Sequence, residues 1–137
     1  MSTNSEILQE INIRRKDIRS LQPYLNKIAE SDLHLNDKKL FEALLDDKDE
    51  FIRLFAFKIL FERLKLDLED YKDKIISIIR NKKEDFDLRI ECSNGIASRY
   101  NGTKNKSALN LFYNLFNDRS ENDLLRGSFF ECMMRIY

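Results

Sequence analysis

The sequence predicts an all-α protein, and three of its features support that prediction. Glycine and proline together number 4 in 137 residues, whereas average usage gives about 16, which disfavours folds with many tight turns, such as β-sandwiches, barrels and Rossmann folds. Apolar residues recur with helical spacing along almost the whole chain. No stretch shows the alternation with period two that marks a strand. The length suits one domain with a sizeable core.

The first part of the chain predicts a helix, a short second helical segment and a connection. The first helix is expected to be capped by Asn4 or Ser5, and it is indicated by the apolar positions Ile7, Ile11, Ile18 and Leu21. Pro23 is expected to interrupt it. The second segment then runs to about Ser31, and residues 31–36 form the connection.

From residue 37 onward the pattern predicts six further helices, separated by polar or acidic turns. Their expected ranges are 37–45, 50–64, 68–80, 86–100, 103–116 and 123–137. The range 50–64 is apolar nearly all round, which predicts burial on two sides. Gly102 is expected to be the C′ residue that ends the helix 86–100.

A repeat becomes visible when the longer helices are aligned. Each has, in its first turn, an aliphatic residue directly before an arginine. These arginines are spaced by 36 and 37 residues, and they are Arg53, Arg89 and Arg126. Such a period, with two helices per unit, predicts a stack of antiparallel helix pairs, that is, a short α-α solenoid. We expect one domain, 1–137, with N-terminal capping helices in 1–35 and helix pairs in 37–66, 67–102 and 103–137.

The repeat unit resembles the HEAT repeat over residues 37–137. The resemblance rests on a helix, an acidic turn and the aliphatic-Arg pair, followed three residues on by a small or apolar residue, here Ala56, Cys92 or Phe129. It implies a right-handed solenoid of HEAT-like helix pairs. It also implies that the three arginines are structural and tie one repeat's turn to its neighbour's, with candidate acceptors at Asp46, Asp47, Asp85 and Asp118.

Motifs for catalysis are missing from the sequence. Three glycines, at 95, 102 and 127, cannot build a dinucleotide fingerprint or a P-loop, and the lone His34 has no C-x-x-C or H-E-x-x-H motif to accompany it. Carboxylate pairs such as Asp46-Asp47 lie in helix-start turns, where the helix dipole favours negative charge. We therefore expect no enzyme, no catalytic residue, no metal and no cofactor. Cys92 and Cys132 lie in apolar helical contexts and are expected to be reduced and buried.

Net charge and targeting signals limit which partners and which cellular location are compatible with the sequence. Lys+Arg and Asp+Glu both number 24, so the net charge is zero, whereas a protein that binds phosphates is usually basic. Nucleic acid is therefore an unlikely partner, although short basic clusters such as Lys82-Lys83 keep that alternative open. The N-terminus is no secretory signal, and the most apolar window, 54–61, is far too short to span a membrane. We expect a cytoplasmic protein with no membrane partner.

The second helix of each pair is expected to line the inner surface of the stack. On helix 86–100 four polar residues follow one line at i, i+4, i+7 and i+11, and the repeat period places matching residues on the other two long helices. The predicted partner-binding residues are Phe55, Lys58, Glu62, Asp87, Glu91, Asn94, Ser98, Ser128, Glu131 and Arg135. Their mixture of both charges, amides and an aromatic is typical of protein recognition. Phe51 and Phe55 are anchor candidates provided that they are exposed.

In size and architecture the chain resembles the small α-solenoid immunity proteins of bacterial polymorphic or contact-dependent toxin systems. The resemblance implies a non-catalytic protein that binds and occludes a cognate toxin domain, for example a basic nuclease facing acidic residues such as Asp87 and Glu91. Two alternatives remain open. A generic HEAT-repeat adaptor or assembly subunit would expose a larger apolar stripe, and a HEAT-like DNA-lesion-binding protein would gather its basic clusters on one concave face.

Overall fold

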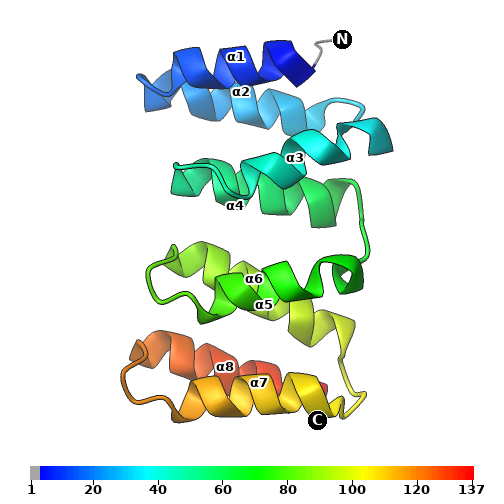
Figure 1. Ribbon diagram of the computed structural model, residues 1–137, viewed down its shortest axis with the longest axis vertical. Coiled ribbons are helices and arrows are strands. Elements are labelled where there is room, and N and C mark those ends of the chain that lie inside the picture. Colours follow the sequence, from blue (N-terminus) through cyan, green and yellow to red (C-terminus); the bar gives the residue numbers. More distant parts are fainter. Residues whose placement is uncertain (1–3) are drawn as a thin grey trace. The chain divides into compact units, whose positions relative to one another are not determined.

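The computed structural model describes residues 4–137, which form eight α-helices and no strand (Figure 1). The prediction of an all-α protein is confirmed. The chain divides into two compact units, Met1–Leu66 and Asp67–Tyr137, which are described separately below.

The first unit begins with two helices whose boundary differs from the predicted one. α1 (Asn4–Arg14) ends well before Pro23, which lies inside α2 (Ile18–Glu30). Asp17 starts α2, because its carboxylate accepts a hydrogen bond from the Arg19 amide (3.1 Å). An internal proline costs a helix about 3 kcal/mol. This cost is offset by burial of one face of α2, formed by Leu21, Leu25 and Ile28. The predicted interruption at Pro23 is therefore wrong.

The expected caps of the first helix, Asn4 and Ser5, are themselves helical residues of α1. The connection predicted for 31–36 contains the start of a short 3-10 turn, η1 (Leu35–Asp37), which leads directly into α3 (Lys38–Leu44). His34 precedes that turn, and its backbone amide donates to the Asp37 carboxylate (3.0 Å). This exposed histidine therefore lies where a connection was predicted.

The rest of the first unit is a long helix in two parts. α4 (Glu50–Lys58) continues without a break as a π-helical stretch, η2 (Ile59–Arg63), so the predicted helix over 50–64 is confirmed. Its core side chains are fully enclosed, and they include Ile52, Ala56 and Leu60. Leu40 and Phe41 of α3 are buried as well, and α3 packs against both α4 and η2.

The second unit contains two helix pairs that pack on each other. η3 (Leu68–Tyr71) leads into α5 (Lys72–Arg80), which packs against α6 (Phe86–Arg99). α7 (Lys106–Asn117) packs against α8 (Asp123–Ile136), and the two helices lie side by side in Figure 1. α8 also packs against α6, so these two long helices join the pairs.

Gly102 adopts the left-handed conformation (φ 69°), as a residue beyond a helix end commonly does. Gly102 is the C″ residue of α6 and not the predicted C′ residue, because the C-cap is Tyr100 and the C′ residue is Asn101. The Gly102 amide donates to the Arg135 carbonyl (2.9 Å), and the Lys104 amide donates to the Ile136 carbonyl (2.8 Å). The loop after α6 thus satisfies carbonyl groups at the end of α8 that have no partner within that helix.

The three repeated arginines all bind backbone carbonyls in the turn or helix end that precedes them. Arg89 donates through Nε to the Ile79 carbonyl (2.9 Å), and Arg126 donates through Nε to the Phe116 carbonyl (2.8 Å), in each case 10 residues earlier. Arg53 donates to the Asp47 carbonyl (2.7 Å), 6 residues earlier. These contacts satisfy carbonyls at the ends of α5 and α7, which have no partner within their own helices.

The side-chain acceptor of Arg89 is Glu121, which the sequence analysis did not name. The two side chains are 2% and 3% exposed, and their atoms Nη1–Oε1 and Nη2–Oε2 are 2.9 and 2.6 Å apart. Of the expected acceptors in this unit, Asp85 instead accepts from the Leu88 amide at the start of α6, and Asp118 pairs with Lys82 (2.7 Å). Glu121 is favoured because it lies in the turn before α8, which packs against α6.

Candidate functional site

In the first unit, α2 faces α4 and η2 across a groove of about 260 Å³. Three of the predicted partner-binding residues line it, namely Phe55, Lys58 and Glu62. The α2 wall contributes Leu25 and Ala29, so the floor is apolar, and the charged side chains lie on the α4–η2 side. We call this feature the α2–α4 groove.

Phe51 is the most exposed apolar side chain of the α2–α4 groove, at 54%. Phe55, one turn further along α4, is half-buried and lines the same groove. Because Ile52 and Ala56 face the core, the helical period turns Phe51 and Phe55 toward the surface. The two phenylalanines were expected to act as anchors provided that they are exposed. Phe51 is exposed and Phe55 is half-buried.

A cluster of ionised side chains supports the start of α4 beside Phe51. The Arg15 guanidinium pairs with the Asp47 carboxylate (Nη1–Oδ2 2.7 Å) and also with Asp49, and Arg15, Asp49 and Phe51 line one small depression. Burial alone would raise the pKa of Asp47, but the hydrogen bonds from Arg15 and from the Asp49 amide outweigh it and lower that pKa. The cluster ties the end of α1 to the turn before α4 and so holds Phe51 in place.

In the second unit, α6 and α8 bring three of the predicted residues into contact. Arg135 of α8 donates to the Asn94 side-chain oxygen (3.3 Å) and to Ser98 Oγ (2.7 Å), and all three are exposed. Arg135 and Ser98 are 37 residues apart, which equals the second spacing of the sequence repeat. Part of the predicted polar line is therefore a row of side chains that bind one another across two helices.

The other predicted residues of this unit lie on the same two helices. Asp87 and Glu91 are in the first half of α6, exposed and half-buried respectively. Ser128 and Glu131 are in the middle of α8, half-buried and exposed respectively. The structure thus places seven predicted residues on α6 and α8 and three on α4 and η2. That all ten form one binding surface stays a prediction.

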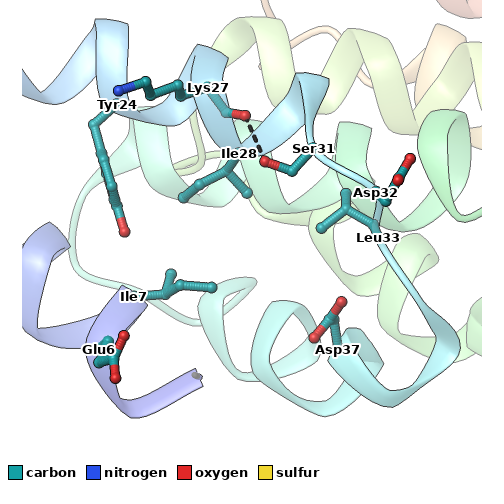
Figure 2. A pocket seen from close by; sticks show the side chains of 9 residues that line it. All are labelled: Glu6, Ile7, Tyr24, Lys27, Ile28, Ser31, Asp32, Leu33 and Asp37. Atoms are coloured by element: carbon teal, nitrogen blue, oxygen red, sulfur yellow. Dashed lines mark hydrogen bonds between the residues drawn. The ribbon is translucent and has the colours of Figure 1, made fainter. Parts of the chain in front are cut away.

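A second hollow in the first unit was not foreseen from the sequence. It encloses about 470 Å³ and is lined from three segments, the start of α1, the end of α2 and the stretch up to η1. Figure 2 shows Tyr24 and Ile28 reaching into it from α2, with Ile7 on the opposite wall. Its rim carries the carboxylates of Glu6, Asp32 and Asp37. No sequence motif marks these residues, since only the tertiary fold brings them together.

Both cysteines are buried thiols, as predicted. Burial raises the pKa of Cys132 to about 11, and burial raises that of Cys92 further. Neither thiol is therefore suited to act as a nucleophile near neutral pH.

Within residues 4–137, the His, Cys, Asp and Glu side chains form no cluster of three or more that is suited to hold a metal ion. Over the same residues, none of the helices combines the length and the apolar character needed to cross a membrane. Comparisons of the chain with protein families, with curated proteins and with solved structures found no match.

Proposed function

We propose that the protein is a non-catalytic protein-binding module, built as a short right-handed solenoid of HEAT-like helix pairs. Its partner is a toxin domain. The protein neutralises this domain in the cytoplasm by covering it. The observation that carries the proposal is the α2–α4 groove with the exposed ring of Phe51 beside it. An aromatic side chain next to an apolar floor is the typical anchor of a protein interface.

The dimensions and the rim of the groove favour a protein over a small molecule. Small-molecule sites usually enclose about 300–1,000 Å³, whereas this groove measures about 260 Å³. Its rim contains the cations Lys58 and Arg63 together with the anion Glu62. An apolar centre with a polar rim of both charges matches the anatomy of protein–protein interfaces.

The choice of a toxin domain as the partner rests on the resemblance to small solenoid immunity proteins. The acidic residues Asp87 and Glu91 of α6 and Glu131 of α8 would attract a basic domain and raise its association rate. DNA is the less favoured partner, because Lys82, one of the basic-cluster residues, is already paired with Asp118 (2.7 Å).

The direct test combines growth rescue with a binding measurement. The full chain is co-expressed with the toxin domain encoded by the adjacent gene, and the two purified proteins are titrated by calorimetry. We expect restored growth and a tight 1:1 complex. Phe51→Ala should weaken binding at least tenfold, because truncation of an interface anchor commonly costs about 2 kcal/mol or more.

Leu35→Ala is the matched control, since Leu35 is an exposed apolar residue of the same unit that does not line the α2–α4 groove. This variant should bind as tightly as the unmodified chain, and circular dichroism should show that both variants keep their helices. Failure of growth rescue would contradict the toxin assignment. Equal affinities for the Phe51→Ala and Leu35→Ala variants would contradict the role of the groove.

A further inference from the structure

Three exposed apolar side chains follow one face of α8. Phe130, Met134 and Tyr137 are 43%, 57% and 67% exposed, and their spacing of i, i+4 and i+7 places them on one side of the helix. The core side of α8 is formed by a different set of residues, Leu125, Phe129, Cys132 and Ile136. The exposed set, which we call the α8 stripe, is therefore additional to the side that the fold already buries.

The α8 stripe lies on the flank of α8 that faces away from α6. The Phe130 ring packs against Phe116 of α7, with 5.4 Å between ring centroids. The side-chain hydrogen bonds from α8 to α6 come from Cys132 and Arg135, on other sides of α8. Tyr113, one turn before Phe116 on α7, extends the apolar area and is also exposed. The stripe is thus separate from the predicted partner-binding residues of α8.

Opposite charges lie at the two ends of the α8 stripe. Asp123, in the first turn of α8, has a side chain that is 95% exposed and lies 3.6 Å from Nη1 of Arg126, whose guanidinium also donates to the Phe116 carbonyl of α7 (2.8 Å). At the other end, the ammonium group of Lys104 lies 4.9 Å from the centre of the Tyr137 ring. Phe130 is seven residues from both Asp123 and Tyr137, which is about 10 Å along the helix in each direction.

This symmetry fits a second copy of the same helix running antiparallel. A two-fold axis through Phe130 would stack the two Phe130 rings, a favourable aromatic pair. The same axis would place Asp123 of one copy beside Lys104 of the other, and it would do so at both ends of the contact. A face with one sign of charge throughout would repel its own copy, whereas this arrangement pairs opposite charges twice.

The area is also sufficient for a stable dimer. Aromatic and long apolar side chains bury about 150–250 Å² each, so the exposed parts of the stripe and Tyr113 amount to roughly 400 Å² per copy. Interfaces are about 60% apolar. Two copies would therefore bury roughly 1,300 Å² in total, within the range of about 1,200–2,000 Å² for specific interfaces.

We propose that the α8 stripe is a homodimer interface, in which α8 of one copy packs antiparallel against α8 of another about a two-fold axis at Phe130. The α8 stripe belongs to the second unit and the α2–α4 groove to the first, so this inference does not depend on the proposed function. It assigns the α8 stripe to self-association and the groove to recognition of another protein.

Sedimentation equilibrium of the full chain, over about 1 to 100 µM, tests the proposal. We expect a reversible dimer. Met134→Lys should weaken it at least tenfold, because it introduces a charge into the desolvated apolar part of the interface, one turn from the axis at Phe130. Asn114→Lys is the matched control: it adds the same charge at an exposed position of α7 outside the stripe and should leave the dimer unchanged.

A charge exchange tests the orientation of the two helices. Asp123→Lys and Lys104→Asp should each weaken the dimer by about two- to fivefold, the range expected for exposed ion pairs, and the double variant should recover the original affinity. A chain that stays monomeric throughout the concentration range overturns the proposal. A dimer that the Met134→Lys substitution leaves intact overturns it as well. The same holds if the Met134→Lys variant loses toxin binding but still self-associates. A dimer weakened by Met134→Lys but not rescued by the double exchange overturns the antiparallel arrangement.

Discussion

Replacing Glu121 by alanine is expected to destabilise the second unit by about 3–5 kcal/mol, because it leaves the Arg89 charge buried without its counter-charge. Arg89 and Glu121 are 2% and 3% exposed, and two parallel N–H···O contacts of 2.9 and 2.6 Å join them. In the variant, Arg89 keeps only its hydrogen bonds to the Ile79 carbonyl, at 2.9 and 2.7 Å. A neutral carbonyl does not replace the lost carboxylate.

The loss is large on the scale of the whole protein, since domains of this size are stable by only about 5–15 kcal/mol. Asp118→Asn is the comparison, because it also removes one carboxylate from an ion pair, here with Lys82, but at a side chain that is 34% exposed, against 3% for Glu121. An exposed pair contributes about 0–1 kcal/mol. The two variants therefore separate the effect of burial from the effect of losing a carboxylate.

Urea unfolding followed by circular dichroism at 222 nm gives the free energy of unfolding of each variant. The double variant Arg89→Met with Glu121→Leu should recover most of the loss, because apolar residues of similar volume replace the pair without leaving a buried charge. A Glu121→Ala variant that loses less than about 1 kcal/mol would refute the reasoning, since that is the value of an exposed pair.

The same pair predicts a dependence of stability on pH. The Arg89 hydrogen bond lowers the pKa of Glu121 below its ordinary value of 4.5. Its contribution to stability is therefore complete above pH 4.5 and is lost as the pH falls through the lowered value in the folded state. A Glu121→Gln variant should lose this part of the pH dependence, as measured by unfolding at a series of acidic pH values.

Three further predictions concern single sites. Gly127→Ala should raise the free energy of unfolding by about 1 kcal/mol, as measured by urea unfolding, because Gly127 is inside α8 and an added Cβ meets nothing within 4 Å. Cys92 and Cys132 should react with a thiol reagent at pH 8 only after urea unfolding, because burial raises both pKa values; rapid reaction of the folded protein would contradict this. Arg15→Met should destabilise the first unit at neutral pH and reduce the part of its stability that is lost on acidification, because the lowered pKa of Asp47 depends on the Arg15 hydrogen bonds; an unchanged dependence of the unfolding free energy on acidic pH would show otherwise.

The helical content and the positions of most helices could be predicted from the sequence by itself. Helical spacing of apolar residues gave the ranges of α3 to α8 to within a few residues, because burying one helical face is a local pattern that the sequence shows directly. The break at Pro23 was predicted wrongly, since a local rule for proline does not include the burial of Leu21, Leu25 and Ile28 that offsets its cost.

Only the tertiary structure decided which side chains meet. It selected Glu121 over Asp85 and Asp118 as the partner of Arg89, gathered the hollow around Tyr24, and left the α8 stripe exposed. These outcomes depend on which helices face each other and on the rotation of each helix about its axis. They join residues that are distant in the sequence, or separate residues of one helix. Sequence spacing defines the faces of a single helix, whereas the packing of several helices determines what each face contacts.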